Sequence, residues 1–209
     1  MLRKRIAWSL MTLASLSIVF LVSRYLTLDP DVFFPEQRAT YLAHLSILIA
    51  HVVGAMVALT IGPFMFLNRL RMRWPAVHRW LGRVYLLGVL VGGTTGLVLA
   101  GYAYTGGTTS AGFAILGLLW LGTGLMAYIR IREGDVQAHR RWMLRNFALT
   151  LAGVSLRMQT LPLAMIFGFD LGYMIVAWSC WIPNLLIVEW MVRKRRTARS
   201  SGARLQQIA

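Results

Sequence analysis

The stretch His78-Arg79-Trp80-Leu81-Gly82-Arg83 is echoed further along the chain by His139-Arg140-Arg141-Trp142-Met143-Leu144-Arg145. In each copy a histidine, several arginines and a tryptophan stand where a polar turn gives way to a long apolar run. Arginine and tryptophan at such a boundary are typical of the point where a membrane helix enters lipid. The two stretches therefore predict two membrane helices that start at one side of a bilayer.

The composition of the whole chain also indicates a membrane protein. Of its 209 residues, 57% are hydrophobic and 14% are charged, and the mean hydropathy is +0.61. These values lie outside the range of soluble domains. The net charge of +15 comes in clusters between apolar runs, so nucleic-acid binding is not expected. The single cysteine, Cys180, excludes an internal disulfide and a thiolate metal site.

We expect an all-α bundle of six transmembrane helices, in a single domain over residues 1–192. The apolar run after the basic N-terminus lacks a small-residue cleavage site, which predicts an uncleaved first helix rather than a signal peptide. Pro75 suits the first position of the third helix, and Asp135 suits the N-cap of the fifth. A basic, polar and disordered tail is expected over residues 193–209. The predicted spans are 6–23, 41–67, 79–104, 111–131, 145–167 and 172–192.

The basic residues predict the orientation of this bundle. All but three of the 22 Lys and Arg residues lie before the first span, in the two His-Arg turns or after the sixth span; the exceptions are Arg24, Arg38 and Arg157. Cytoplasmic loops of membrane proteins carry an excess of Lys and Arg. Both termini and both turns are therefore expected on the cytoplasmic side of the cell inner membrane.

Small residues predict how the helices pack. The third span carries Gly88, Gly92 and Gly96 at four-residue spacing, followed by Ala100. Such a stripe lets the backbone of another helix approach closely. That helix could belong to this chain or to a second copy, so an oligomer through the stripe is also open.

The two histidines of the repeated stretch are candidate haem ligands. His78 and His139 are expected at matching depth in the first turns of two helices, and two neutral imidazoles can supply both axial ligands of haem b. The arginines that would then contact haem propionates or lipid phosphates are Arg79, Arg83, Arg140 and Arg145. The alternative is that each His-Arg-Trp group only anchors its helix among the lipid headgroups, a role that does not need imidazole.

His51 and Arg157 are ionisable residues expected deep in the membrane. Each lies about ten residues from the outer end of its helix, which corresponds to roughly 15 Å by helical rise. A guanidinium at that depth needs an anion or several carbonyls. A quinone, a small anionic ligand or a haem propionate could occupy such a site, or the two residues could belong to a proton path. Alternatively, His51 bonds a neighbouring helix, and Arg157 snorkels or satisfies backbone carbonyls.

The same residues resemble known families. His51, the run from His78 to Tyr85, and the run from His139 to Arg145 followed by Arg157 resemble a bacterial family of predicted membrane proteins, DUF2306. More distantly, histidines on several central helices are similar to the cytochrome b561 and ferric-reductase group of transmembrane electron carriers. That resemblance implies haem held by histidine pairs. His78 and His139 would match one pair and His51 half of the other, although the fourth span has no histidine.

Three functions follow as expectations. The first is a b-type-cytochrome-like protein that binds haem and passes electrons to or from quinone. The second is a haem-free membrane protein that binds or transports a small anionic or lipidic molecule, with His51 and Arg157 as its counter-charges. The third is a structural accessory subunit whose polar groups only fasten helices together.

Overall fold

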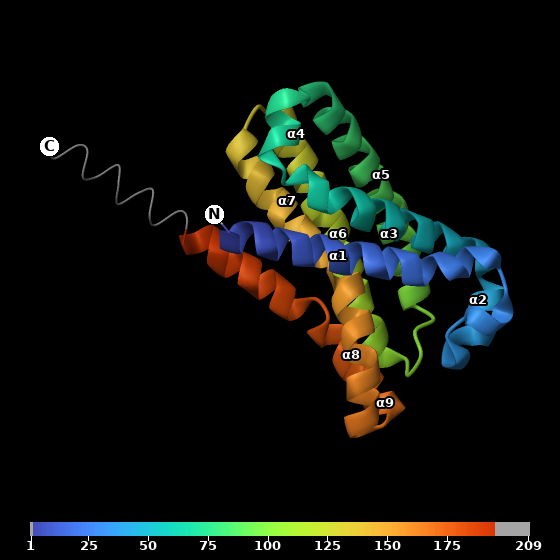
Figure 1. Cartoon of the computed structure of the whole chain (residues 1–209). Coiled ribbons are helices and arrows are strands. Elements are labelled where there is room, and N and C mark those ends of the chain that lie inside the picture. The colour runs from blue at the N-terminus through green and yellow to red at the C-terminus, as the bar shows by residue number, and fades with distance from the viewer. Residues whose placement is uncertain (1, 195–209) are drawn as a thin grey trace, which may run out of the picture.

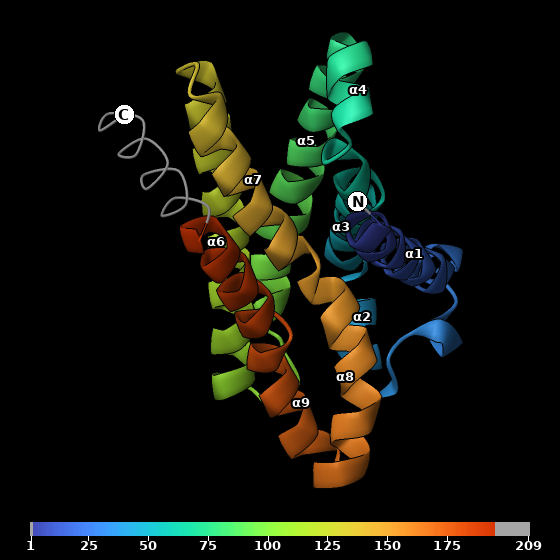
Figure 2. The ribbon, with the colours of Figure 1, turned by 60° about the vertical axis from the view of Figure 1, so that its left-hand side comes forward.

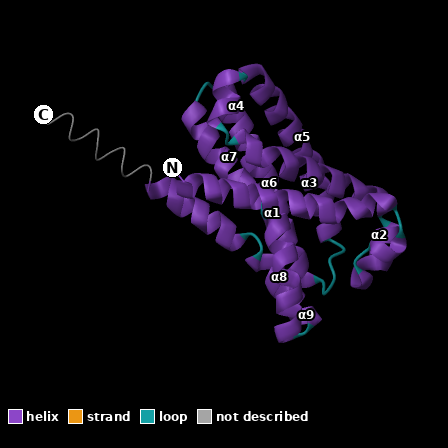
Figure 3. Cartoon of the chain, in the orientation of Figure 1, coloured by secondary structure: helices purple, strands orange, loops and turns teal. Residues whose placement is uncertain are grey.

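The structure is a computed structural model that describes residues 2–194, so residues 195–209 of the predicted tail lie outside it. The described residues form helices joined by short turns and contain no strand (Figure 3). Six helical segments are long and apolar enough to cross a membrane, which confirms the predicted all-α, six-span fold. These segments are Arg5–Thr27, Leu45–Met65, Pro75–Ala100, Gly107–Arg132, Val136–Phe167 and Phe169–Lys194.

The elements follow one another with few long connections (Figure 1). Pro75 starts the third span and the Asp135 side chain accepts a hydrogen bond from the Ala138 N–H at 2.8 Å, as predicted for both positions. The helices are α1 (Leu2–Ser23), α2 (Arg38–Ala43), α3 (Leu45–Met65), α4 (Asn68–Arg73), α5 (Pro75–Ala100), α6 (Gly107–Arg132), α7 (Val136–Thr150), α8 (Ala152–Phe167), α9 (Phe169–Ser179) and a last helix over residues 182–194. Three short 3-10 helices, η1 (Arg24–Thr27), η2 (Pro30–Val32) and η3 (Pro35–Gln37), connect α1 to α2.

Both His-Arg turns lie at one end of the molecule. Figures 1 and 2 show α4 and the turn between α6 and α7 at the top of the bundle in both views. We call this end the α4 end. The sequence therefore predicted correctly that the two copies of the repeated stretch lie at the same end of the bundle.

The glycine stripe of α5 packs against α3 within the chain. A methyl group added to Gly54 of α3 would lie 2.5 Å from the Gly92 nitrogen and 2.8 Å from the Gly88 oxygen. A methyl group on Gly96 would lie 2.9 Å from Nδ1 of His51. The stripe thus brings two backbones of one chain together, and an oligomer of this protein stays a prediction.

The fifth and sixth spans are each broken, whereas the sequence predicted continuous helices. The fifth is interrupted at Leu151, directly after Thr150, whose hydroxyl donates to the Asn146 oxygen at 3.1 Å and so competes with the backbone ladder. The sixth is interrupted at residues 180–181, before Pro183, which has no N–H for the Ser179 carbonyl. That carbonyl accepts a hydrogen bond from the Gln159 amide of α8 instead, at 3.5 Å.

Candidate functional site

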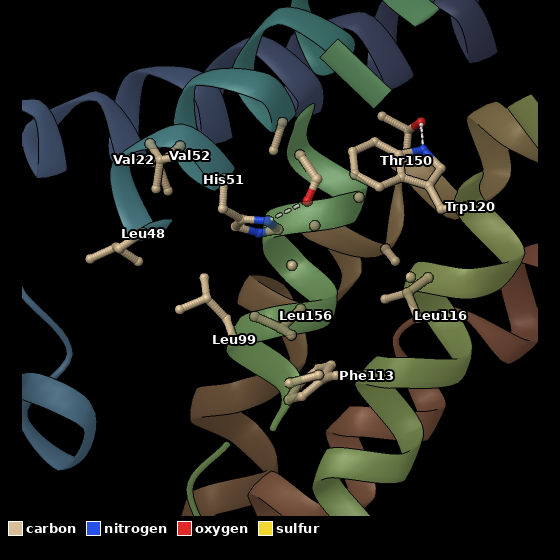
Figure 4. A pocket seen from close by; sticks show the side chains of 18 of the residues that line it. Val22, Leu48, His51, Val52, Leu99, Phe113, Leu116, Trp120, Thr150 and Leu156 are labelled. Carbon is tan, nitrogen blue, oxygen red and sulfur yellow. Dashed lines mark hydrogen bonds between the residues drawn. The ribbon is translucent and has the colours of Figure 1, made fainter. Parts of the chain in front are cut away.

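A cavity of about 230 Å³ lies inside the bundle, between α3, α5, α6 and the break that separates α7 from α8 (Figure 4). Its wall is mostly apolar, and residues of the broken segment form part of it. Among the residues that line it are Leu48, Val52, Leu99, Phe113, Leu116 and Leu156. Both His51 and Arg157 line this cavity, so the structure brings these two predicted site residues together.

His51 is held against α5 by its ring. Its Nδ1 lies 2.8 Å from the Gly92 carbonyl oxygen (Figure 4), and Gly96 leaves the ring room to lie there. Because a carbonyl oxygen only accepts, Nδ1 carries the proton and a neutral ring presents a lone pair at Nε2. Within residues 2–194 that Nε2 has no hydrogen-bonding partner.

Arg157 of α8 has few partners of its own. One of its terminal nitrogens donates to the Gly153 oxygen, one turn earlier, at 3.2 Å. None of the ion pairs formed by the described residues includes it. A guanidinium has five N–H groups, so one carbonyl leaves most of its donors available to a ligand.

Three tyrosines share the cavity with Arg157. Tyr25, Tyr41 and Tyr173 all lie within electrostatic range of the guanidinium, and all three line the cavity. Burial raises the pKa of the Tyr41 phenol, so this side chain is a neutral hydroxyl at physiological pH. Arg157 therefore shares the cavity with tyrosine side chains and pairs with no carboxylate of residues 2–194.

A buried hydrogen-bond network forms the wall opposite His51, and our sequence analysis did not find it. The Tyr85 hydroxyl donates to Oδ1 of Asn146 at 2.7 Å, and the Trp120 indole donates to the Thr150 hydroxyl at 2.9 Å. The hydroxyl oxygens of Tyr85 and Thr150 lie 2.9 Å apart. Trp120 and Thr150 line the cavity, so the network fixes the shape of its wall. The sequence feature that could have predicted this network is Asn146, a polar amide inside an apolar span.

His78 and His139 lie at the α4 end, away from the cavity. Nδ1 of His139 lies 2.8 Å from the Ala127 oxygen of α6, which leaves its Nε2 without a bond to the described residues. Nδ1 of His78 is buried and has no hydrogen-bond partner in residues 2–194. His78 is within electrostatic range of both Arg71 and His139.

The four arginines predicted to contact propionates or phosphates do not form one group. Both Nε and one terminal nitrogen of Arg145 donate to the Glu189 carboxylate, and its guanidinium lies 4.7 Å from the centroid of the Trp142 ring. Arg145 therefore ties α7 to the last helix through a protein carboxylate. Arg79, Arg83 and Arg140 are exposed at the α4 end.

Six membrane spans around an internal cavity define this chain as a multi-pass integral membrane protein with a candidate ligand site in its membrane core. It belongs to the family described as Predicted membrane protein (DUF2306), whose model matches residues 48–192. The match covers both His-Arg stretches, His51 and Arg157, and confirms the family resemblance seen in the sequence. No curated protein and no solved structure matches the chain. The likeness to cytochrome b561 stays a prediction.

Proposed function

We propose that this protein binds a small amphipathic molecule, with an apolar body and a hydrogen-bond-accepting or anionic head, in the cavity between α3, α5, α6 and α8. The observation that carries this proposal is the position of Arg157, which has no carboxylate partner in the described chain and lines an apolar cavity beside His51. An ionisable group within a membrane span is costly unless it is paired. Oxygen atoms of a ligand would supply the missing partner.

The helix break next to the cavity supports the same proposal. Irregular backbone at membrane depth is tolerated where it is buried in protein or lines a cavity, and transporters often bind substrates at such discontinuous helices. Here Thr150, Ala152 and Gly153, on both sides of the break, line the cavity. The broken fifth span is therefore consistent with a binding site and is less expected of a purely structural subunit.

The size of the cavity favours a small occupant. Its volume of about 230 Å³ is below the range of roughly 300–1,000 Å³ that is usual for pockets holding drug-sized ligands. A small acid or the head of a lipidic molecule such as a quinone suits this volume better than a whole haem. The tail of a lipidic molecule would extend between helices toward the bilayer.

The experiment is a binding titration of the full-length protein in lipid nanodiscs. We expect decylubiquinol, decylubiquinone or decanoate to give saturable binding by calorimetry. The Arg157→Gln variant should weaken that binding about tenfold to a hundredfold, because a hydrogen bond to a charged group contributes roughly 1.5–3 kcal/mol. Arg132→Gln is the matched control, since Arg132 is an exposed arginine at the end of α6 that does not line the cavity. Unchanged affinity in Arg157→Gln, or no binding of any probe, would contradict the proposal.

A second candidate function is haem binding at the α4 end, through His78 and His139. The observation that favours it is the hydrogen bond from His139 to the Ala127 carbonyl, because ligating histidines are commonly oriented by such a bond at the nitrogen that does not bind the metal. His78 lies within electrostatic range of His139, and its buried Nδ1 has no hydrogen-bond partner among residues 2–194. Haem b bound there would supply one-electron transfer, and the exposed arginines of the α4 end, Arg79, Arg83 and Arg140, would be the candidates to contact its propionates.

We also propose that the protein resides in the cell inner membrane with both termini in the cytoplasm. The basis is the clustering of Lys and Arg at the two His-Arg turns and at both termini. Membrane lipids would then contact the exposed arginines of the α4 end through their phosphates.

A further inference from the structure

We infer that the ligand of the cavity is a quinol, an aromatic ring with two hydroxyl groups. One hydroxyl donates a hydrogen bond to Nε2 of His51, and the oxygen of the other accepts a hydrogen bond from Arg157. This inference rests on the proposed function, because it names the class of molecule that the same cavity binds. It follows from what each of the two polar side chains can still offer.

His51 offers only an acceptor. Its Nδ1–H is committed to the Gly92 carbonyl at 2.8 Å, and the ring lies so close to Gly96 that a methyl group there would be 2.9 Å from Nδ1. A second proton on this ring would put a cation within electrostatic range of Arg157 in the same apolar cavity, where two like charges without a counter-ion are costly. His51 therefore needs an O–H or N–H group from the ligand.

Arg157 offers only donors. A guanidinium has no acceptor atom, and one N–H of Arg157 is already used on Gly153. The ligand must therefore present an oxygen that accepts, in addition to the hydroxyl that His51 requires. If one ligand bonds to both side chains, the hydroxyl and the accepting oxygen belong to the same molecule.

Few lipid-soluble heads carry both groups in that state. A quinone has two carbonyl acceptors and no donor. A protonated carboxylic acid has one donor and one carbonyl acceptor, but beside an arginine it ionises and loses its donor. A phenolic hydroxyl keeps its proton at neutral pH, because its ordinary pKa is about 10, and its oxygen still accepts.

The wall of the cavity favours a ring as the body of this head. Aromatic side chains from several separate elements face it: Tyr25, Tyr41, Phe113, Trp120 and Tyr173. Aromatic rings pack against one another in edge-to-face or offset arrangements that add to the burial of apolar area. Among molecules with two hydroxyl groups, the cavity should therefore prefer an aromatic one to an aliphatic diol.

The test compares three ligands that share one ring and one tail, on wild-type protein in nanodiscs under anaerobic conditions. The ligands are decylubiquinol, decylubiquinone and the dimethyl ether of the quinol, which keeps both ring oxygens and lacks both hydroxyl protons. We expect the quinol to bind at least about tenfold more tightly than the other two, because a site built around a hydroxyl rejects analogues that leave its polar group unpaired. His51→Phe should weaken quinol binding and leave quinone binding unchanged.

The outcomes separate this inference from the proposed function. Equal affinity for the three ring compounds, or tighter binding of decanoate than of the quinol, would overturn the inference and leave the cavity as a binding site. No binding of any ring compound or of decanoate would overturn the proposed function itself. Should His51→Phe fail to fold, the comparison with the dimethyl ether still decides the inference, since it uses the wild-type protein.

Discussion

The polar residues in the membrane core of this protein differ in whether the chain itself satisfies them. Asn146 is fully buried, and its amide nitrogen donates to the Trp120 oxygen at 2.7 Å and to the Thr123 hydroxyl at 2.9 Å. Arg157 donates to a single backbone carbonyl, and Nε2 of His51 has no hydrogen-bond partner in residues 2–194. A satisfied polar group fastens helices together, whereas an unsatisfied one beside a cavity needs a ligand. This difference is what separates the site from the structural network.

Haem ligation is a prediction about two individual histidines. If His78 and His139 bind haem, protein purified from haem-supplied cells should show a Soret band, with sharp α and β bands after dithionite reduction. His139→Ala should abolish this spectrum, because it removes one axial ligand. His44→Ala is the matched control, since the His44 ring packs against Tyr102 with centroids 4.1 Å apart and lies outside both candidate sites. A colourless preparation would contradict the haem candidate without affecting the cavity.

At the scale of single helices, the contact between α3 and α5 positions His51. Both helices present small residues to each other, and the ring of His51 lies in the space that Gly96 leaves. The sequence predicted the stripe correctly as a packing surface. It did not reveal which helix covers the stripe, because glycine spacing carries no information about the partner.

We predict that this contact tolerates no side chain. In Gly54→Ala, the added carbon would meet the Gly92 nitrogen and the Gly88 oxygen, which are backbone atoms and cannot rotate away. We expect a loss of about 1–3 kcal/mol in the free energy of unfolding, as is usual for overpacking, measured by urea or thermal unfolding in detergent.

The control for this substitution is Gly122→Ala on α6. A methyl group there would have no heavy atom within 4 Å, so stability should stay the same or rise by up to about 1 kcal/mol, because alanine favours the helix over glycine. Equal stability of the two variants would show that α3 and α5 are less closely packed than described.

At the scale of the whole molecule, six spans place both His-Arg turns at one end, and we predict that this end faces the cytoplasm. In a Cys180→Ala background, single cysteines replacing Met72 and Val136 should be protected from a membrane-impermeant maleimide in intact cells. Cysteines replacing Asp29 and Gly107 should be labelled. All four positions are exposed in the structure, so burial does not confuse the readout. Labelling of Met72→Cys and Val136→Cys from opposite sides would exclude a haem shared between the two turns.

The sequence by itself determined the class of this protein, its six spans and the common side of its two His-Arg turns. These properties follow from hydrophobicity and charge along the chain, and each can be read within one helix length. The placement of Pro75 and Asp135 at helix starts followed from local backbone chemistry in the same way.

Only the tertiary structure decided which polar residues meet. Whether His51 and Arg157 face one cavity depends on the rotation of α3 and α8 about their axes, and that rotation is set by packing against other helices. The pairing of Arg145 with Glu189 was hidden for the same reason, since the two residues lie far apart in the sequence. Lipid tails are as apolar as the interior of the bundle, so the pattern of apolar residues does not show which face of a helix turns inward.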